Sequence, residues 1–87
     1  MLEKKYFYKL YLGCKRGMLE LDIILINYLE IICLRSDYIF LKKFNRLLKE
    51  SDEKLYNWII KGVICEDIYF VDLIVNINKF RQYVKFV

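Results

Sequence analysis

The sequence contains no histidine and no proline, and alanine and threonine are missing as well. Without histidine, the chain lacks the commonest general base and the commonest zinc ligand. Neither a glycine-rich phosphate loop nor a convincing pair of carboxylates takes its place. We therefore expect a protein that is not an enzyme, with no catalytic residues and no metal site.

Cysteine and long apolar runs are also scarce. The three cysteines lie far apart without a CxxC pair, which is typical of a reducing cytosol, and we interpret them as small buried hydrophobic residues. The longest apolar stretches, such as Ile23–Ile26, fall far short of the roughly 20 residues that span a bilayer. The charged segment 1–9 does not resemble a signal peptide. We expect a cytoplasmic protein with no membrane insertion.

What the chain does contain predicts a folded core. Of its 87 residues, 57% are hydrophobic and 17% are aromatic, which is not the composition of a disordered protein. The length suits one domain, which we expect to comprise residues 1–87. The abundance of Ile, Lys and Tyr without Ala is typical of AT-biased coding, so the net charge of +4 is a weak functional indication.

Apolar residues recur at intervals of three and four, which predicts helices in five segments. The first is expected at residues 4–12, and the second begins near Gly17 or Met18. The second helix carries the clearest apolar stripe, formed by Leu21, Ile24, Leu25, Tyr28, Leu29 and Ile32. The third helix places Phe40, Leu41, Phe44, Leu47 and Leu48 on its inner side.

Polar residues and glycine predict where these helices begin and end. Ser36 is expected to cap the third helix and Ser51 the fourth, while Gly62 ends the fourth. Trp58 is expected in the core, because it shares a face with Leu55 and Ile59. The segment 66–83 is rich in β-branched and aromatic residues, which suits a strand. It is too long for one strand and would lack a partner, so we expect a helix there, with Phe70, Leu73, Ile74, Ile77 and Val84 at helical spacing.

The most distinctive stretch is residues 14–22. Its sequence Arg-Gly-Met-Leu-Glu-Leu-Asp, at positions 16–22, resembles the RGxxE signature of the succinate dehydrogenase assembly factor 2 family. The bacterial members of this family are called FAD assembly factors and were earlier regarded as antitoxins. Residues 44–48 and 51–59 resemble the family's F-x-x-L-L and D-x-x-L-x-x-W-L patterns, so the resemblance extends over about 8–81. Where the family has Gly-x-Pro, this chain has Gly62-Val63-Ile64.

The resemblance implies an all-α fold, a compact five-helix bundle that acts as an assembly factor or chaperone. It would bind the flavoprotein subunit of succinate dehydrogenase or fumarate reductase and promote covalent attachment of FAD to it. The assembly factor itself would bind no cofactor stably and would be a monomer. It would supply only a shaped binding surface, because the histidine that bonds to FAD would belong to the partner.

The resemblance assigns partner binding to Arg16, Gly17 and Glu20, with Met18 and Asp22 as neighbours. Gly17 has no Cβ, so another backbone can approach closely. Arg16 offers a planar fork of donors for carboxylates or carbonyls. Glu20, near a helix start, could accept from a cation or an N–H group. The simpler interpretation of Arg16 and Glu20 is a local i, i+4 ion pair.

Two other functions remain as alternatives. The residues Lys42, Lys43, Arg46 and Lys49 could form a nucleic-acid-binding stripe on the third helix. A solvated helix face is the more ordinary explanation, and we expect no nucleic acid partner. The older description of the family leaves an antitoxin-like regulatory protein as the other alternative.

Overall fold

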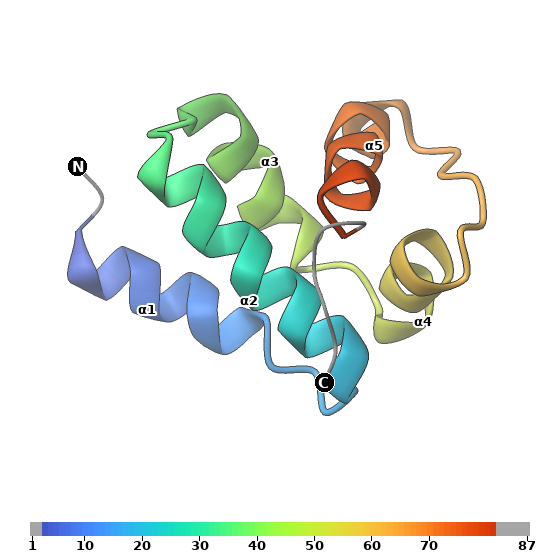
Figure 1. Cartoon of the computed structure of the whole chain (residues 1–87), viewed down its shortest axis with the longest axis horizontal. Helices are drawn as coiled ribbons and strands as arrows, with labels where there is room; N and C mark the ends of the chain where they lie inside the picture. The colour runs from blue at the N-terminus through green and yellow to red at the C-terminus, as the bar shows by residue number, and fades with distance from the viewer. Residues whose placement is uncertain (1–2, 82–87) are drawn as a thin grey trace.

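Helices make up all the regular secondary structure of residues 3–81, the part of the chain that the computed structural model describes (Figure 1). They are α1 (Lys4–Gly13), α2 (Leu19–Leu34), α3 (Tyr38–Leu47), α4 (Asp52–Leu55) and α5 (Ile68–Arg81). Helix α4 runs directly into a π-helical segment, η1 (Tyr56–Ile60). No strand occurs among the described residues, which confirms the prediction of an all-α, five-helix protein.

Helix α2 is the central element, because it packs against α1, α3, η1 and α5 (Figure 1). All six residues of its predicted stripe are buried, which confirms that face as the core face. The other helices bury residues against it, namely Leu10, Leu41, Phe44, Leu47, Leu55, Trp58, Ile59, Phe70, Leu73, Ile74 and Ile77. Burying a side chain of this kind stabilises the fold by roughly 1.5–3 kcal/mol. The core prediction for Trp58 is confirmed, since its side chain is 4% exposed.

The turn between α2 and α3 corrects one predicted cap. Asp37, not Ser36, caps α3, because its Oδ1 accepts the Phe40 N–H at 3.1 Å. Ser36 instead ends α2 in the left-handed region, with φ of 53°. The N–H groups of Ser36 and Asp37 donate to the carbonyls of Cys33 and Ile32. This is the Schellman pattern that closes helix C-termini, usually with glycine at the position of Ser36.

The segment α4–η1 begins and ends as predicted, but its second part is a π-helix and not an α-helix. Ser51 Oγ accepts the Lys54 N–H at 3.2 Å, which confirms the N-cap. Gly62 has a φ of 72°, and beside it the Val63 N–H donates to the Asn57 carbonyl at 2.8 Å, closing the helix. The π-helical turn between these ends was not predicted. Segment η1 packs against α2 and α5, so its surroundings include segments distant in the sequence.

Polar side chains of α5 hold that helix against η1. Asn78 Nδ2 donates to the Trp58 carbonyl at 3.3 Å, and Arg81 Nη1 donates to the carbonyls of Ile59 and Ile60. Carbonyls at a helix end lack intrahelical partners, so these donors satisfy groups that would otherwise need water. The helix predicted for segment 66–83 is confirmed at Ile68–Arg81, whereas Tyr83 and Val84 lie outside the described residues.

The prediction that the cysteines are buried is confirmed for two of the three. Cys14 and Cys65 are buried as predicted, while Cys33 is half-buried; all three are free thiols.

On α3, Lys43 Nζ and the Arg46 guanidinium lie 5.3 and 4.5 Å from the centre of the Tyr69 ring. Within residues 3–81, every helix is too short or too polar to reach across a bilayer.

The turn between α2 and α3 yields a prediction about stability. Replacing Asp37 with alanine removes the cap of α3 and should lower the free energy of unfolding by about 1 kcal/mol. Replacing Ser36 with glycine should leave it unchanged or raise it, because glycine adopts a positive φ without strain. Urea denaturation of the two variants measures both effects. A larger loss for Ser36→Gly would contradict the assignment of the cap.

Candidate partner-binding site

The loop between α1 and α2 is closed onto α2 by one carboxylate. Asp22 Oδ1 accepts the Arg16 N–H at 2.9 Å, and Asp22 Oδ2 accepts the Gly17 N–H at 3.1 Å. Asp22 lies in the first turn of α2, where negative charge also complements the helix dipole. The backbone of the loop therefore has a defined path into the helix.

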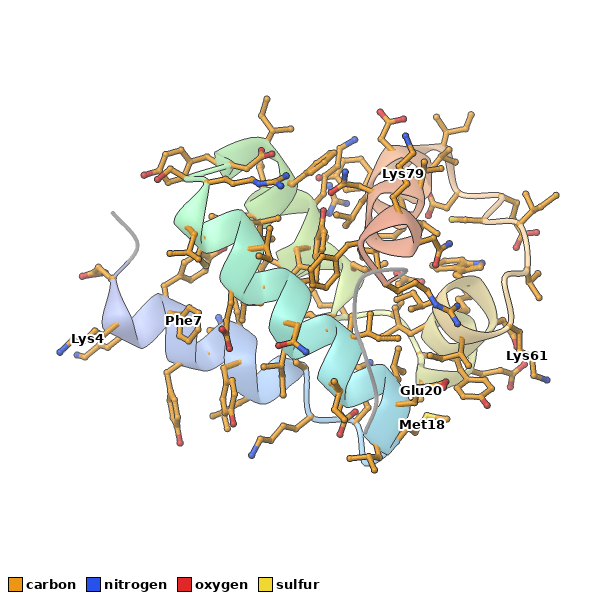
Figure 2. All side chains as sticks on the ribbon, viewed as in Figure 1. Lys4, Phe7, Met18, Glu20, Lys61 and Lys79 are labelled. Carbon is orange, nitrogen blue, oxygen red and sulfur yellow. The ribbon has the colours of Figure 1, made fainter. Side chains whose placement is uncertain are left out.

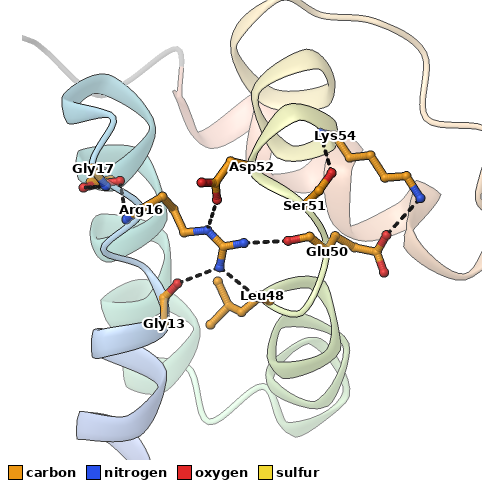
Figure 3. Close-up of polar contacts among 9 residues, drawn as sticks. Gly13, Arg16, Gly17, Leu48, Glu50, Ser51, Asp52 and Lys54 are labelled. Carbon is orange, nitrogen blue, oxygen red and sulfur yellow. Dashed lines mark hydrogen bonds and ion pairs between the residues drawn. The ribbon is translucent and has the colours of Figure 1, made fainter.

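A second set of contacts ties the same loop to the turn before α4, as Figure 3 shows. Arg16 Nε donates to Asp52 Oδ1 at 2.7 Å, and Nη1 donates to the carbonyls of Gly13 and Leu48 at 3.0 and 2.7 Å. Nη2 donates to the Glu50 carbonyl at 2.5 Å. We call this set of hydrogen bonds the Arg16 clasp. It joins two loops that lie more than 30 residues apart in the sequence.

The clasp uses properties that belong to arginine alone. Two of its three carbonyl acceptors, Leu48 and Glu50, follow the last turn of α3, where carbonyls have no helical partner. A planar guanidinium reaches several acceptors at once, whereas a lysine ammonium is a single point of charge. The Arg16 side chain is only 13% exposed and that of Asp52 is 54% exposed. The carbonyl bonds thus lie on the sheltered side of the clasp, and the ion pair lies at its rim.

The structure places the five predicted site residues in two groups. Arg16 and Asp22 shape the loop from within, and Met18 is half-buried as the residue that precedes α2. Gly17 and Glu20 are exposed, and the Glu20 carboxylate forms no hydrogen bond or ion pair within residues 3–81. The interpretation of Arg16 and Glu20 as a local ion pair is wrong, because Arg16 pairs with Asp52. Partner binding by the motif stays a prediction.

Gly17 has a conformation and a setting that suit contact with another protein. Its φ is 83°, a left-handed value that glycine adopts at little cost. A Cβ built on Gly17 would meet no atom within 4 Å, so the space in front of the backbone is open. Nothing among residues 3–81 requires that space to be free. A close approach by another chain would require it.

Leu19 is a surface residue that the sequence-based prediction missed. It lies between Gly17 and Glu20 and is 78% exposed. Its position could have indicated exposure, because Leu19 falls outside the apolar stripe that starts at Leu21 and faces the core. We define the loop face as Gly17, Leu19 and Glu20. It combines an open backbone, an apolar side chain and a carboxylate.

Cys14 lies directly before this loop but is chemically quiet. Its side chain is fully buried, and burial raises the pKa of the thiol to about 12. Arg16 lowers that pKa and Asp22 raises it, both by less than burial does. The thiolate is the reactive form of cysteine, so the thiol is inert at neutral pH. Among residues 3–81, no group of three or more Cys, Asp or Glu side chains is placed to hold a metal ion.

Fold and site together define a small helical protein that presents a preformed loop, whose polar side chains shape the loop instead of activating a reacting group. The comparisons with known proteins agree. The chain belongs to the family described as "Flavinator of succinate dehydrogenase", whose family model matches residues 8–81. The resemblance inferred from the motif is thereby confirmed.

Several curated relatives carry the name FAD assembly factor SdhE. The protein of Coxiella burnetii (strain RSA 493 / Nine Mile phase I) is 37% identical over 71 residues, which is 76% of this chain and 80% of the relative. That of Francisella tularensis subsp. tularensis (strain SCHU S4 / Schu 4) is 40% identical over 55 residues. This second match spans 63% of the chain and only 58% of the relative's length. No solved structure matches the chain.

The Arg16 clasp yields a second prediction about stability. Replacing Arg16 with lysine keeps the charge but loses the fork, and should lower the free energy of unfolding by about 2 kcal/mol, since hydrogen bonds to charged groups contribute roughly 1.5–3 kcal/mol. Replacing Asp52 with asparagine affects only the exposed rim and should cost less than about 1 kcal/mol. Chemical denaturation compares the two. Equal losses would show that the ion pair, not the carbonyl bonds, dominates the clasp.

Proposed function

We propose that this protein is an FAD assembly factor, a chaperone that binds the flavoprotein subunit of succinate dehydrogenase or fumarate reductase and promotes covalent attachment of FAD to it. The observation that carries the proposal is the family match over residues 8–81. The names of the relatives support it, since they are FAD assembly factors. The loop face supplies a surface for such a role within the matched residues.

The geometry supports binding by a preformed surface. A loop that is already ordered loses little conformational freedom when a partner docks, so more of the contact energy appears as affinity. Asp22 and the Arg16 clasp provide that order, and the loop face provides the contact. Gly17 admits a partner's backbone, Leu19 offers an apolar anchor, and Glu20 offers an acceptor for a cation or an N–H group. Arg16 and Asp22 thus act on the partner through the shape of the loop.

The size of the chain sets the scale of the complex. Its accessible surface is 6054 Å². A standard interface covers about 800 Å² on each partner, so one face of a monomer suffices. In this proposal the bond to FAD forms on a residue of the flavoprotein, in the cytoplasm. The assembly factor holds that subunit in a productive conformation and binds no cofactor stably itself.

The nucleic-acid alternative has less structural support. Two of the four basic residues on and just after α3, Lys43 and Arg46, lie over the Tyr69 ring and are engaged within the chain. A stripe for phosphates would need these side chains to extend outward together. The contacts with Tyr69 therefore favour a packed and solvated helix face.

The proposed role predicts a change in protein-bound flavin. Removing this protein from its cell should lower the in-gel flavin fluorescence of the flavoprotein subunit after denaturation, because covalent attachment would proceed unaided. The abundance of the subunit, measured by immunoblotting on the same samples, is the control. Unchanged fluorescence at normal abundance would reject the proposed function.

The loop face predicts a matched pair of variants. Replacing Gly17 with arginine should abolish co-purification with the flavoprotein subunit, because the new side chain occupies the space where the partner approaches. Gly62→Arg is the matched control, since Gly62 also has a positive φ and an open Cβ position. Both variants should lose roughly 1 kcal/mol of stability and keep a helical circular dichroism spectrum. Equal retention of the partner by both variants would argue against the loop face.

A further inference from the structure

A small cleft of about 180 Å³ lies between α2 and α5. Tyr28 and Ile31 of α2 line it together with Arg35, which follows that helix, and α5 contributes Asn76, Lys79 and Phe80. The cleft is separate from the loop face, because Leu19 and Ile31 are 12 residues apart on one helix, or about 18 Å along its axis. Figure 2 labels Lys79 on α5, and Met18 and Glu20 at the start of α2.

One hydrogen bond determines which polar group the inner wall of the cleft offers to a ligand. The Tyr28 hydroxyl donates to Asn76 Oδ1 at 2.5 Å. Burial raises the pKa of Tyr28, with a further upward contribution from Asp37 and a downward one from Arg35, so the phenol stays protonated and keeps donating. The amide oxygen of Asn76 is thereby occupied. The Nδ2 group of Asn76, which has no partner within residues 3–81, remains as a donor.

The charges at the rim have one sign. Of residues 3–81, the charged ones that line the cleft are Arg35 and Lys79, and both are exposed. Among residues 3–81, no carboxylate lines it, and the nearby Asp37 accepts the Phe40 N–H at the start of α3. The remaining lining side chains, Ile31 and Phe80, are apolar and half-buried. The cleft therefore offers cationic and neutral donors at its rim and wall together with an apolar surface.

We propose that this cleft is a binding site for a carboxylate carried on a short apolar stem. Arg35 and Lys79 pair with the carboxylate, the Asn76 amide donates to it, and the stem lies against Ile31 and Phe80. The volume suits a ligand the size of one side chain, since pockets for larger organic ligands span roughly 300–1,000 Å³. Such a group could come from a free acid or from an acidic side chain of a bound protein. The site does not depend on the function proposed above.

Nuclear magnetic resonance of the full-length, ¹⁵N-labelled chain tests the site. Sodium benzoate should produce saturable shifts of the Asn76 side-chain NH₂ signals and of amides near Arg35, at constant ionic strength. Inorganic phosphate is the contrasting probe. A response to phosphate as strong as that to benzoate would overturn the assignment to carboxylates, and no saturable shift with benzoate or any other carboxylate probe would overturn the site.

Paired variants separate the site from general attraction of anions. Replacing both Arg35 and Lys79 with glutamine should weaken benzoate binding at least ten-fold, because hydrogen bonds to charged groups are lost. Replacing Lys42 and Lys49 with glutamine removes the same charge from exposed positions on and just after α3 and should leave binding unchanged. Equal weakening in the two double variants would refute the cleft as the site.

A third probe distinguishes the two sources of the carboxylate. N-acetylglutamic acid α-amide presents a glutamate side chain as it occurs within a protein. Tighter binding of this compound than of benzoate assigns the site to an acidic side chain of a protein. Tighter binding of benzoate assigns it to a free aromatic acid.

Discussion

The burial of one face of α2 is the constraint on which the rest of the structure depends. Helix α2 buries six side chains and packs against α1, α3, η1 and α5, so each neighbouring helix is oriented by the same element. The hydrophobic core thereby fixes where the ends of α2 lie. The loop face lies at the N-terminal end, and the cleft between α2 and α5 lies toward the C-terminal end. Both surfaces are consequences of where that helix is packed.

The RGxxE motif combines two kinds of residue that a sequence signature does not distinguish. Arg16, with the nearby Asp22, contacts its own chain and gives the loop its conformation. Gly17 and Glu20 lie at the surface, with Leu19 between them. Loss of binding after mutation of Arg16 would therefore reflect a changed loop, whereas loss after mutation of Gly17 would reflect a changed contact. If the proposed function holds, only Gly17 and Glu20 of the motif would face the partner, and Arg16 would act through the conformation of the loop.

Much of the fold could be predicted because its signals are local. The helical spacing of Leu21 through Ile32, the cap at Ser51 and the helix end at Gly62 each depend on a few neighbouring residues. The π-turn of η1 and the partners of Arg16 could not, because the contacts of η1 and of the Arg16 guanidinium reach about 20 and 30 or more residues along the chain. Ser36 was misassigned because only two residues separate the end of α2 from Asp37, the cap of α3. Ser36 belongs to the hydrogen-bonded end of α2, and the cap is the next residue. Leu19 was missed because periodicity identifies the core and gives no account of an apolar residue outside it.

The Arg16 clasp also has a consequence for chain topology. Arg16 and Asp52 lie 36 residues apart, so their contact closes a large loop of the chain as a cross-link would. The cysteines of this chain are free thiols, so no disulfide makes such a connection. The Arg16 guanidinium instead connects the two segments in the folded state only, by contacts that need no oxidant and do not depend on the redox state of the surroundings. The family signature at Arg16 thus doubles as a non-covalent staple.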